Sequence, residues 1–280
     1  MTEPPLPSEP PPQPLTGEVL PGQGTPPGTV PGLHPPGEVA RPAHAAYTPP
    51  ARTPYVTYTI MGITIFIFVL QLGTETFLGT DLPALYGMKV NEWIAEGQLW
   101  RLFTPMLLHG GLIHILFNMY ALRSLGPALE QHYGHSRFLA LYLLAGFAGN
   151  VVSLALSPNP SLGASTSLFG LFGAEGVFLY HNRALFGERA RAGLRQILTL
   201  AAINLFIGLS PGIDNWGHVG GLIGGALFAW FAGPLLKVEG TFPAYSIQDR
   251  REPINVWVTA AGVGILFAGI AVGVIFLRLT

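Results

Sequence analysis

Two polar residues with complementary chemistry stand in the apolar part of the chain: Ser165 and His218 each begin a segment long enough to cross a membrane. A polar or ionisable group inside a membrane is costly and usually faces the interior of a helix bundle or a water-filled cavity. A serine hydroxyl is a weak nucleophile until a base within hydrogen-bond reach takes its proton, and an imidazole is such a base. The pair therefore predicts nucleophilic catalysis, with Ser165 as nucleophile and His218 as base.

A second polar group stands at the start of another apolar segment. His114 and Asn118 are four residues apart and would share one helix face, and His109 lies five residues before His114. Acyl transfer needs hydrogen-bond donors aimed at the oxygen that becomes negative in the tetrahedral intermediate. The Asn118 amide, the His114 imidazole and the backbone N–H of Ser165 would supply them.

A metal site is the competing interpretation of these histidines. The spacing of His109 and His114 puts them on different helix faces, and the sequence has no HExxH run and no acidic residue close by. We therefore predict neither a metal nor a cofactor.

Glycines would let the two helices that carry the nucleophile and the base approach each other. Gly217, Gly221 and Gly225 recur every four residues and so line one helix face, the small-residue pattern of closely packed membrane helices. Gly163 and Gly170 give the other helix similarly low relief. The alternative is ordinary glycine packing around a hydrogen-bonded serine.

Composition identifies the broad class of protein. The 280 residues are 49% hydrophobic and only 10% charged, against roughly 25% charged in soluble domains. We therefore expect a membrane protein with the lipid bilayer as its surroundings. A net charge of -1 gives no reason to expect a nucleic-acid partner, and the absence of cysteine excludes disulfides, thiolate metal sites and a cysteine nucleophile. The composition fixes no oligomeric state.

Hydropathy divides the chain into four parts. Residues 1–54 hold 17 of the 26 prolines and few large apolar residues, so we expect a disordered, solvated tail in the cytoplasm. A helical core over 55–236, a linker over 237–255 and an additional C-terminal helix over 256–280 follow. The fold class expected is an all-α polytopic membrane helix bundle. About seven spans are predicted, near 58–79, 105–125, 137–157, 163–181, 195–210, 215–236 and 256–277.

Residues 81–104, between the first two spans, are amphipathic and carry Trp93, Trp100 and Arg101. Such a stretch is expected in the headgroup region, where aromatic residues favour the interface and Arg101 would tie the loop to it.

Charge distribution predicts the orientation. Three of the 14 Lys and Arg residues, Lys89, Arg101 and Arg278, fall on one side of the predicted spans, and the other eleven fall on the opposite side or in the tail. Short cytoplasmic loops collect these residues, so the N-terminus is expected in the cytoplasm and the C-terminus outside, in a cell membrane. Ser165 and His218 then lie at similar depth near the outer face.

These residues together resemble the rhomboid family of intramembrane serine proteases, over roughly residues 58–236. The resemblance implies a six-helix core, a Ser165–His218 dyad without an acid, an oxyanion site at His114 and Asn118, and hydrolysis of transmembrane helices of other proteins. It also implies that residues 256–280 form an extra helix found in one branch of the family. The matching motifs are Trp100-Arg101 followed by His109, His114 and Asn118, then Gly163-Ala164-Ser165, and finally Gly217-His218-Val219-Gly220-Gly221.

Two residues depart from the pattern of many family members. Thr166 stands where glycine usually follows the nucleophile, and its branched side chain would narrow the turn or the substrate subsite. Phe169 stands where many relatives carry a tyrosine that stacks on the catalytic histidine; stacking survives the change, but a hydroxyl contact does not.

Glu175 is a further ionisable residue, ten residues beyond Ser165 in the same apolar segment. At 1.5 Å per helical residue it lies about 15 Å from Ser165, too far to act on the same substrate atom. We therefore expect a structural role, hydrogen bonded or protonated.

Two alternatives to an active protease are a catalytically inactive rhomboid-like protein that binds membrane proteins in quality control, and an unrelated transporter. Inactive relatives usually lack the serine or the histidine, and both are present in this chain. A transporter predicts internal repeats and broken half-helices, and the sequence has no convincing repeat.

Overall fold

The computed structural model describes residues 52–241 and 244–279. The tail predicted for residues 1–54 therefore lies, up to residue 51, outside the described residues. Residues 46–280 form one unit, to which every element below belongs.

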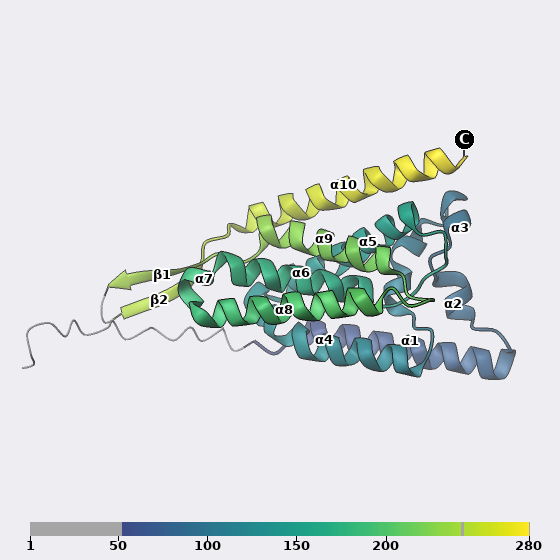
Figure 1. The fold of residues 1–280 in the computed structure, drawn as a ribbon, viewed down its shortest axis with the longest axis horizontal. Coiled ribbons are helices and arrows are strands. Elements are labelled where there is room, and N and C mark those ends of the chain that lie inside the picture. Colours follow the sequence, from purple (N-terminus) through teal and green to yellow (C-terminus); the bar gives the residue numbers. More distant parts are fainter. Residues whose placement is uncertain (1–51, 242–243, 280) are drawn as a thin grey trace, which may run out of the picture. The chain divides into compact units, whose positions relative to one another are not determined.

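Among the described residues, seven helices of 17 residues or more run along one bundle (Figure 1). They are α1 (Tyr55–Leu78), α4 (Leu112–Tyr133), α5 (His135–Leu156), α6 (Ser165–His181), α8 (Glu188–Ile207), α9 (Asn215–Ala232) and α10 (Pro253–Leu279). Short elements connect them: α2 (Leu82–Gly87), α3 (Asn91–Ala95), the 3-10 turns η1 (Leu99–Leu102) and η2 (Thr104–Leu107), and α7 (Arg183–Phe186). The all-α membrane bundle expected from hydropathy is confirmed.

The centre of the bundle is formed by α5, α6 and α9, which pack against one another more closely than any other helices. Glycine permits this approach, because a Cβ at Gly221 would collide with the carbonyl oxygen of Thr166, and one at Gly225 would collide with the backbone of Gly170. The predicted glycine face of α9 therefore lies against α6, and it brings the backbones of the two site-bearing helices into contact.

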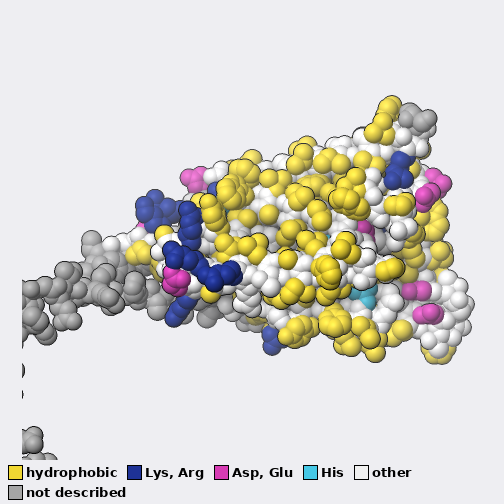
Figure 2. Space-filling view, viewed as in Figure 1, with side chains coloured by type: hydrophobic (Ala, Val, Ile, Leu, Met, Phe, Trp, Pro, Cys, Tyr) yellow, Lys and Arg dark blue, Asp and Glu magenta, His cyan; other side chains and the backbone are white. Residues whose placement is uncertain are grey.

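Four helices, α1, α5, α8 and α10, are long and apolar enough to cross a membrane by length and composition alone. The three remaining long helices, α4, α6 and α9, carry the core of the predicted site: His114 and Asn118, Ser165, and His218 with its glycines. Polar groups reduce the hydropathy of these helices, and burial in the bundle keeps such groups away from lipid. Apolar side chains cover much of the visible face (Figure 2). The chain is an integral membrane protein.

The stretch between α1 and α4 is held by hydrogen bonds to its own backbone. Arg101, 2% exposed, donates from Nη1 to Met88 O at 2.7 Å and from Nη2 to Leu85 O at 2.9 Å, and its guanidinium lies 4.3 Å from the ring centroid of Trp93. The half-exposed Trp100 donates to Tyr86 O at 3.0 Å. Arg101 therefore holds this loop together from within, and the prediction that it ties the loop to the membrane interface is wrong because its side chain is buried.

The segment expected as a linker contains a β-hairpin. β1 (Leu236–Thr241) pairs antiparallel with β2 (Ala244–Asp249), and Asp249 accepts from Arg137 of α5 at 2.8 Å. Proline then opens α10, where its missing N–H costs nothing because the first helical turn leaves that group unpaired. Hydropathy did not indicate the hairpin, because the polar residues on both strands are equally typical of a solvent-exposed linker.

Candidate active site

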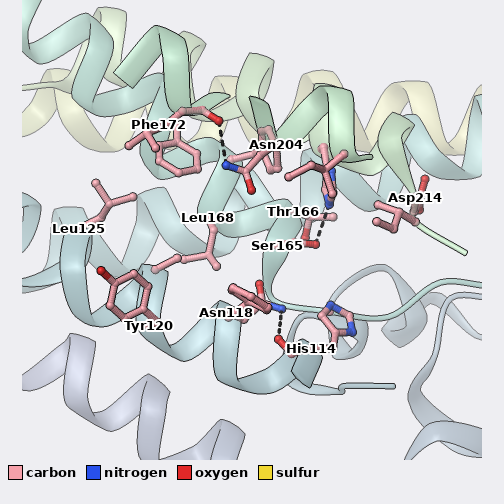
Figure 3. Close-up of a pocket in the computed structure, with 18 of the residues that line it drawn as sticks. His114, Asn118, Tyr120, Leu125, Ser165, Thr166, Leu168, Phe172, Asn204 and Asp214 are labelled. Carbon is pink, nitrogen blue, oxygen red and sulfur yellow. Dashed lines mark hydrogen bonds between the residues drawn. The ribbon is translucent and has the colours of Figure 1, made fainter. Parts of the chain in front are cut away.

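The structure places Ser165 and His218 within hydrogen-bond distance. Ser165 is the first residue of α6 and His218 lies in the first turns of α9, and the distance from Ser165 Oγ to His218 Nε2 is 2.9 Å (Figure 3). The ring of Phe169, one turn beyond Ser165, stacks on the His218 ring with centroids 4.3 Å apart and planes 13° apart. Stacking on one face fixes the plane of the imidazole, so Nε2 points at the hydroxyl.

Hydrogen bonds hold the backbone of the two residues that precede Ser165. Gly163 has φ +139°, a conformation that strains any residue with a Cβ. Its N–H donates to Pro105 O at 2.9 Å, and the N–H of Ala164 points to Nε2 of His109 at 3.5 Å. His109 is 1% exposed, and its backbone N–H and C=O both bond to the side-chain amide of Gln71. His109 thus positions the turn that presents Ser165.

His114 and Asn118 lie on α4 across the cavity from Ser165 (Figure 3). The N–H of Gly110 points to His114 Nδ1 at 3.4 Å, which assigns the imidazole proton to Nε2. A Cβ at Gly163 would lie 2.8 Å from that Nε2, so glycine lets the imidazole reach the turn before Ser165. Asn118 Nδ2 donates one proton to His114 O at 3.0 Å and keeps its second proton for another acceptor.

His109 and His114 contact each other edge to face, with ring centroids 5.0 Å apart. Within residues 52–241 and 244–279, no group of three or more His, Cys, Asp or Glu side chains is placed to hold a metal ion.

Other residues named from the sequence have packing roles or lie elsewhere. Trp100 and Arg101 do not line the cavity that holds the dyad. The Thr166 side chain points into the α5–α9 contact, where a Cβ at Gly149 or Gly217 would come within 3.0 Å of its methyl group. The branched side chain therefore fills space that two glycines leave, while Thr166 also borders the cavity.

A buried polar network that the sequence did not indicate lies behind the dyad. Lys89, fully buried between α2 and α3, donates from Nζ to Ser153 Oγ at 2.7 Å and to the carbonyls of Ser153 and Ser157 at 3.3 and 3.2 Å. Ser153 Oγ bonds in turn to Asp214 Oδ2. Asp214 caps α9 by accepting from the N–H of Gly217 at 3.0 Å.

This network ends one helical turn from His218, because Asp214 and His218 are four residues apart on α9. Burial lowers the pKa of Lys89 to about 8, while the negative charge of Asp214 acts to raise it. The N-cap pattern Asp214-Asn215-Trp216-Gly217 indicates the start of α9, but it does not indicate the link to Lys89.

The dyad, His114, Asn118 and Glu175 all line one cavity of about 1540 Å³ bounded by α4, α6, α8 and the loops before α4 and α6. Fold and site together define an integral membrane helix bundle with a serine–histidine pair inside it. Such a pair, with amide and imidazole donors facing it, suits acyl transfer.

Comparison with known proteins agrees with this class. Residues 96–235 match the Rhomboid domain family. Rhomboid protease GluP of Bacillus subtilis (strain 168) is 38% identical over 218 residues, covering 78% of this chain and 41% of GluP. RHOMBOID-like protein 2 of Arabidopsis thaliana is 35% identical over 213 residues, covering 74% of this chain and 67% of that protein.

The chain belongs to the rhomboid family, as the resemblance predicted. It spans 41% of the length of GluP and likewise 41% of RHOMBOID-like protein 9, chloroplastic, of Arabidopsis thaliana, which is 34% identical over 179 residues.

Proposed function

We propose that this protein is a serine endopeptidase that hydrolyses peptide bonds in or near transmembrane helices of other membrane proteins. The observation that carries the proposal is the 2.9 Å distance between Ser165 Oγ and His218 Nε2 on the wall of a cavity inside the bundle. Similarity to GluP, whose name describes a protease, supports the same activity.

The reaction follows from the two groups. Ser165 Oγ attacks the carbonyl carbon of the scissile peptide while His218 Nε2 takes the hydroxyl proton. The C–N bond breaks when the protonated imidazole returns that proton to the leaving amine, and an acyl-serine remains. A water molecule then loses a proton to Nε2 and attacks the acyl carbon, which releases the carboxylic product and restores Ser165. Phe169 holds the imidazole plane through both proton transfers.

The negative oxygen of the tetrahedral intermediate would be stabilised by three donors. The N–H of Ser165 has no partner within α6, because it belongs to the first turn of that helix. His114 Nε2–H and the second amide proton of Asn118 face the same cavity from α4. Gly163, Gly217 and Gly221 assist by close backbone approach.

We further infer a topology with the N-terminus in the cytoplasm and the C-terminus outside, in the cell membrane. Lys and Arg side chains gather at the end of the bundle where α7 and the hairpin lie (Figure 2), and cytoplasmic ends of membrane proteins collect these residues. The catalytic core then spans residues 55–236, residues 237–255 connect it on the cytoplasmic side, and residues 256–280 add a further span.

Single substitutions of the dyad test the activity. Ser165→Ala and His218→Ala should each abolish cleavage of a reporter transmembrane substrate in proteoliposomes, because the two groups act as a unit. A fluorophosphonate probe should label the wild type and the matched control Ser167→Ala, a neighbouring buried serine outside the cavity, but not Ser165→Ala. A wild-type chain that binds helices, cleaves none and resists the probe would instead be an inactive rhomboid-like binding protein.

A further inference from the structure

The cavity extends far beyond the dyad. From Ser165 to Leu179 it follows one face of α6, and 14 residues at 1.5 Å per residue span about 21 Å. Its walls are stripes at helical spacing, namely Ala121, Leu125 and Ala128 on α4 and Gly193, Ile197 and Leu200 on α8. The walls are mostly small and apolar, with Ser124, Gln196 and Asn204 among them. Walls of this length match a hydrophobic helix that carries a few polar side chains, and the groove is continuous with the proposed active site.

Glu175 is an ionisable side chain in this groove, well away from the dyad. It lines the cavity about 15 Å from Ser165, ten residues along α6. Its Oε2 atom is buried, and among the described residues no hydrogen-bond donor lies within reach of it. None of the ion pairs in that part of the chain involves Glu175. The sequence predicts a structural role that is hydrogen bonded or protonated, and Oε2 lacks the partner that the hydrogen-bonded form of this role requires.

An unpaired carboxyl oxygen that is buried in a membrane helix bundle carries a substantial desolvation cost. Asn204, a polar residue on the same cavity, donates from its amide to Leu200 O at 2.8 Å, whereas Glu175 Oε2 has no donor among the described residues. A molecule that occupies the groove could supply the missing hydrogen-bond donor.

We propose that Glu175 forms a specificity subsite that accepts a hydrogen bond from a donor side chain on the transmembrane helix of the substrate. This inference rests on the proposed function, and it names the substrate class as transmembrane segments that carry Ser, Thr, Asn, Gln, His, Lys or Arg at one depth. That depth lies toward the end of the bundle with the hairpin. A fully helical substrate would place the donor about ten residues from the scissile bond, and one extended near the dyad about six.

A scan of donor position tests the subsite. Reporter substrates carry an all-Leu segment beyond the scissile bond, with one Gln or one Lys moved from position 3 to position 14. We measure the ratio of kcat/KM for each donor substrate to that of the all-Leu parent. The wild type should show a maximum at about positions six to ten, threefold to thirtyfold above neighbouring positions, the range for one hydrogen bond between membrane helices.

Substitutions of Glu175 test whether this residue causes the maximum in the kcat/KM profile. Glu175→Leu should flatten the profile, whereas the nearly isosteric Glu175→Gln should keep the maximum for Gln and lose the advantage of Lys. Glu188→Leu, at an exposed glutamate of α8 outside the cavity, is the matched control and should keep the wild-type profile. A profile that is flat in the wild type, or that keeps its maximum in Glu175→Leu, would overturn the proposal.

A binding measurement tests the subsite independently of the proposed protease activity. With Ser165→Ala, the affinities for the same transmembrane peptides are measured without cleavage. A position-dependent gain in affinity that Glu175→Leu removes would support the subsite. If the wild type nevertheless cleaved no substrate, that lack of cleavage would count against the proposed protease activity and not against the subsite. Equal affinity for donor and all-Leu peptides would overturn the subsite.

Discussion

Replacing Asp214 by alanine should disturb the base without touching it. The substitution removes the acceptor of the Gly217 N–H at the start of α9 and the partner of Ser153 Oγ. Loss of an N-cap costs about 1 kcal/mol, and loss of a hydrogen bond to a charged group costs about 1.5–3 kcal/mol. Lys89 also loses its main compensating charge while it stays buried. We expect the free energy of unfolding to fall by about 2.5–4 kcal/mol.

The effect on catalysis comes from the position of His218, one turn beyond Asp214 on α9. Ser165 Oγ and His218 Nε2 lie 2.9 Å apart, and a misplacement of about 1 Å costs on the order of 10²-fold in rate. Asp214→Ala should therefore lower kcat by on the order of 10²-fold, with KM changed only a few-fold. Asp214→Asn keeps a good N-cap and should retain most of kcat.

The assay compares kcat in proteoliposomes with Tm in detergent. Asp249→Ala is the matched control, since Asp249 also accepts backbone hydrogen bonds, from Leu235 and Arg251, and contacts Arg137, but in the hairpin segment. It should lose stability and keep kcat. Asp214→Ala should lower Tm by about 5–15 °C. An Asp214→Ala protein with wild-type kcat would refute the argument that the cap positions His218.

Four further results are expected. Asn118→Ala should lower kcat by on the order of 10²-fold with less effect on KM, and an unchanged kcat would remove Asn118 from the oxyanion site. Gly221→Val should abolish activity and lower Tm because its side chain would collide with the α6 backbone, whereas Gly262→Val on α10, where nothing lies within 4 Å, should be tolerated. Between about pH 8 and 10.5 the Lys89 side chain keeps its proton in the unfolded chain and has lost it in the folded chain. Lys89 therefore makes the free energy of unfolding rise with pH across that window. The Lys89→Met protein should lack this rise when its denaturation is measured at several pH values. A tag after Thr280 should be accessible outside intact cells, and a cytoplasmic tag there would overturn the predicted span count.

Several features of this protein could be predicted from local sequence. Apolar segments long enough for a bilayer predict helices, and the all-α membrane bundle and the family are confirmed. Ser165 and His218 stand out in the sequence because polar groups in such segments are costly and rare. The close approach of their helices followed from the four-residue repeat of Gly217 and Gly221, which places both glycines on one face. Each of these signals lies within one helix.

Only the tertiary structure decided which helix faces meet and which buried polar atoms find partners. Lys89, Ser153 and Asp214 come from three segments far apart in the sequence, so no local pattern could indicate that an interfacial lysine would be buried against α5 and linked to the cap of α9. Glu175, for which the sequence predicts only a structural role, lines a cavity, because α4 and α8 leave space beside that face of α6. Hydropathy and helical period are properties of single segments, whereas cavities and buried networks depend on how several segments pack together.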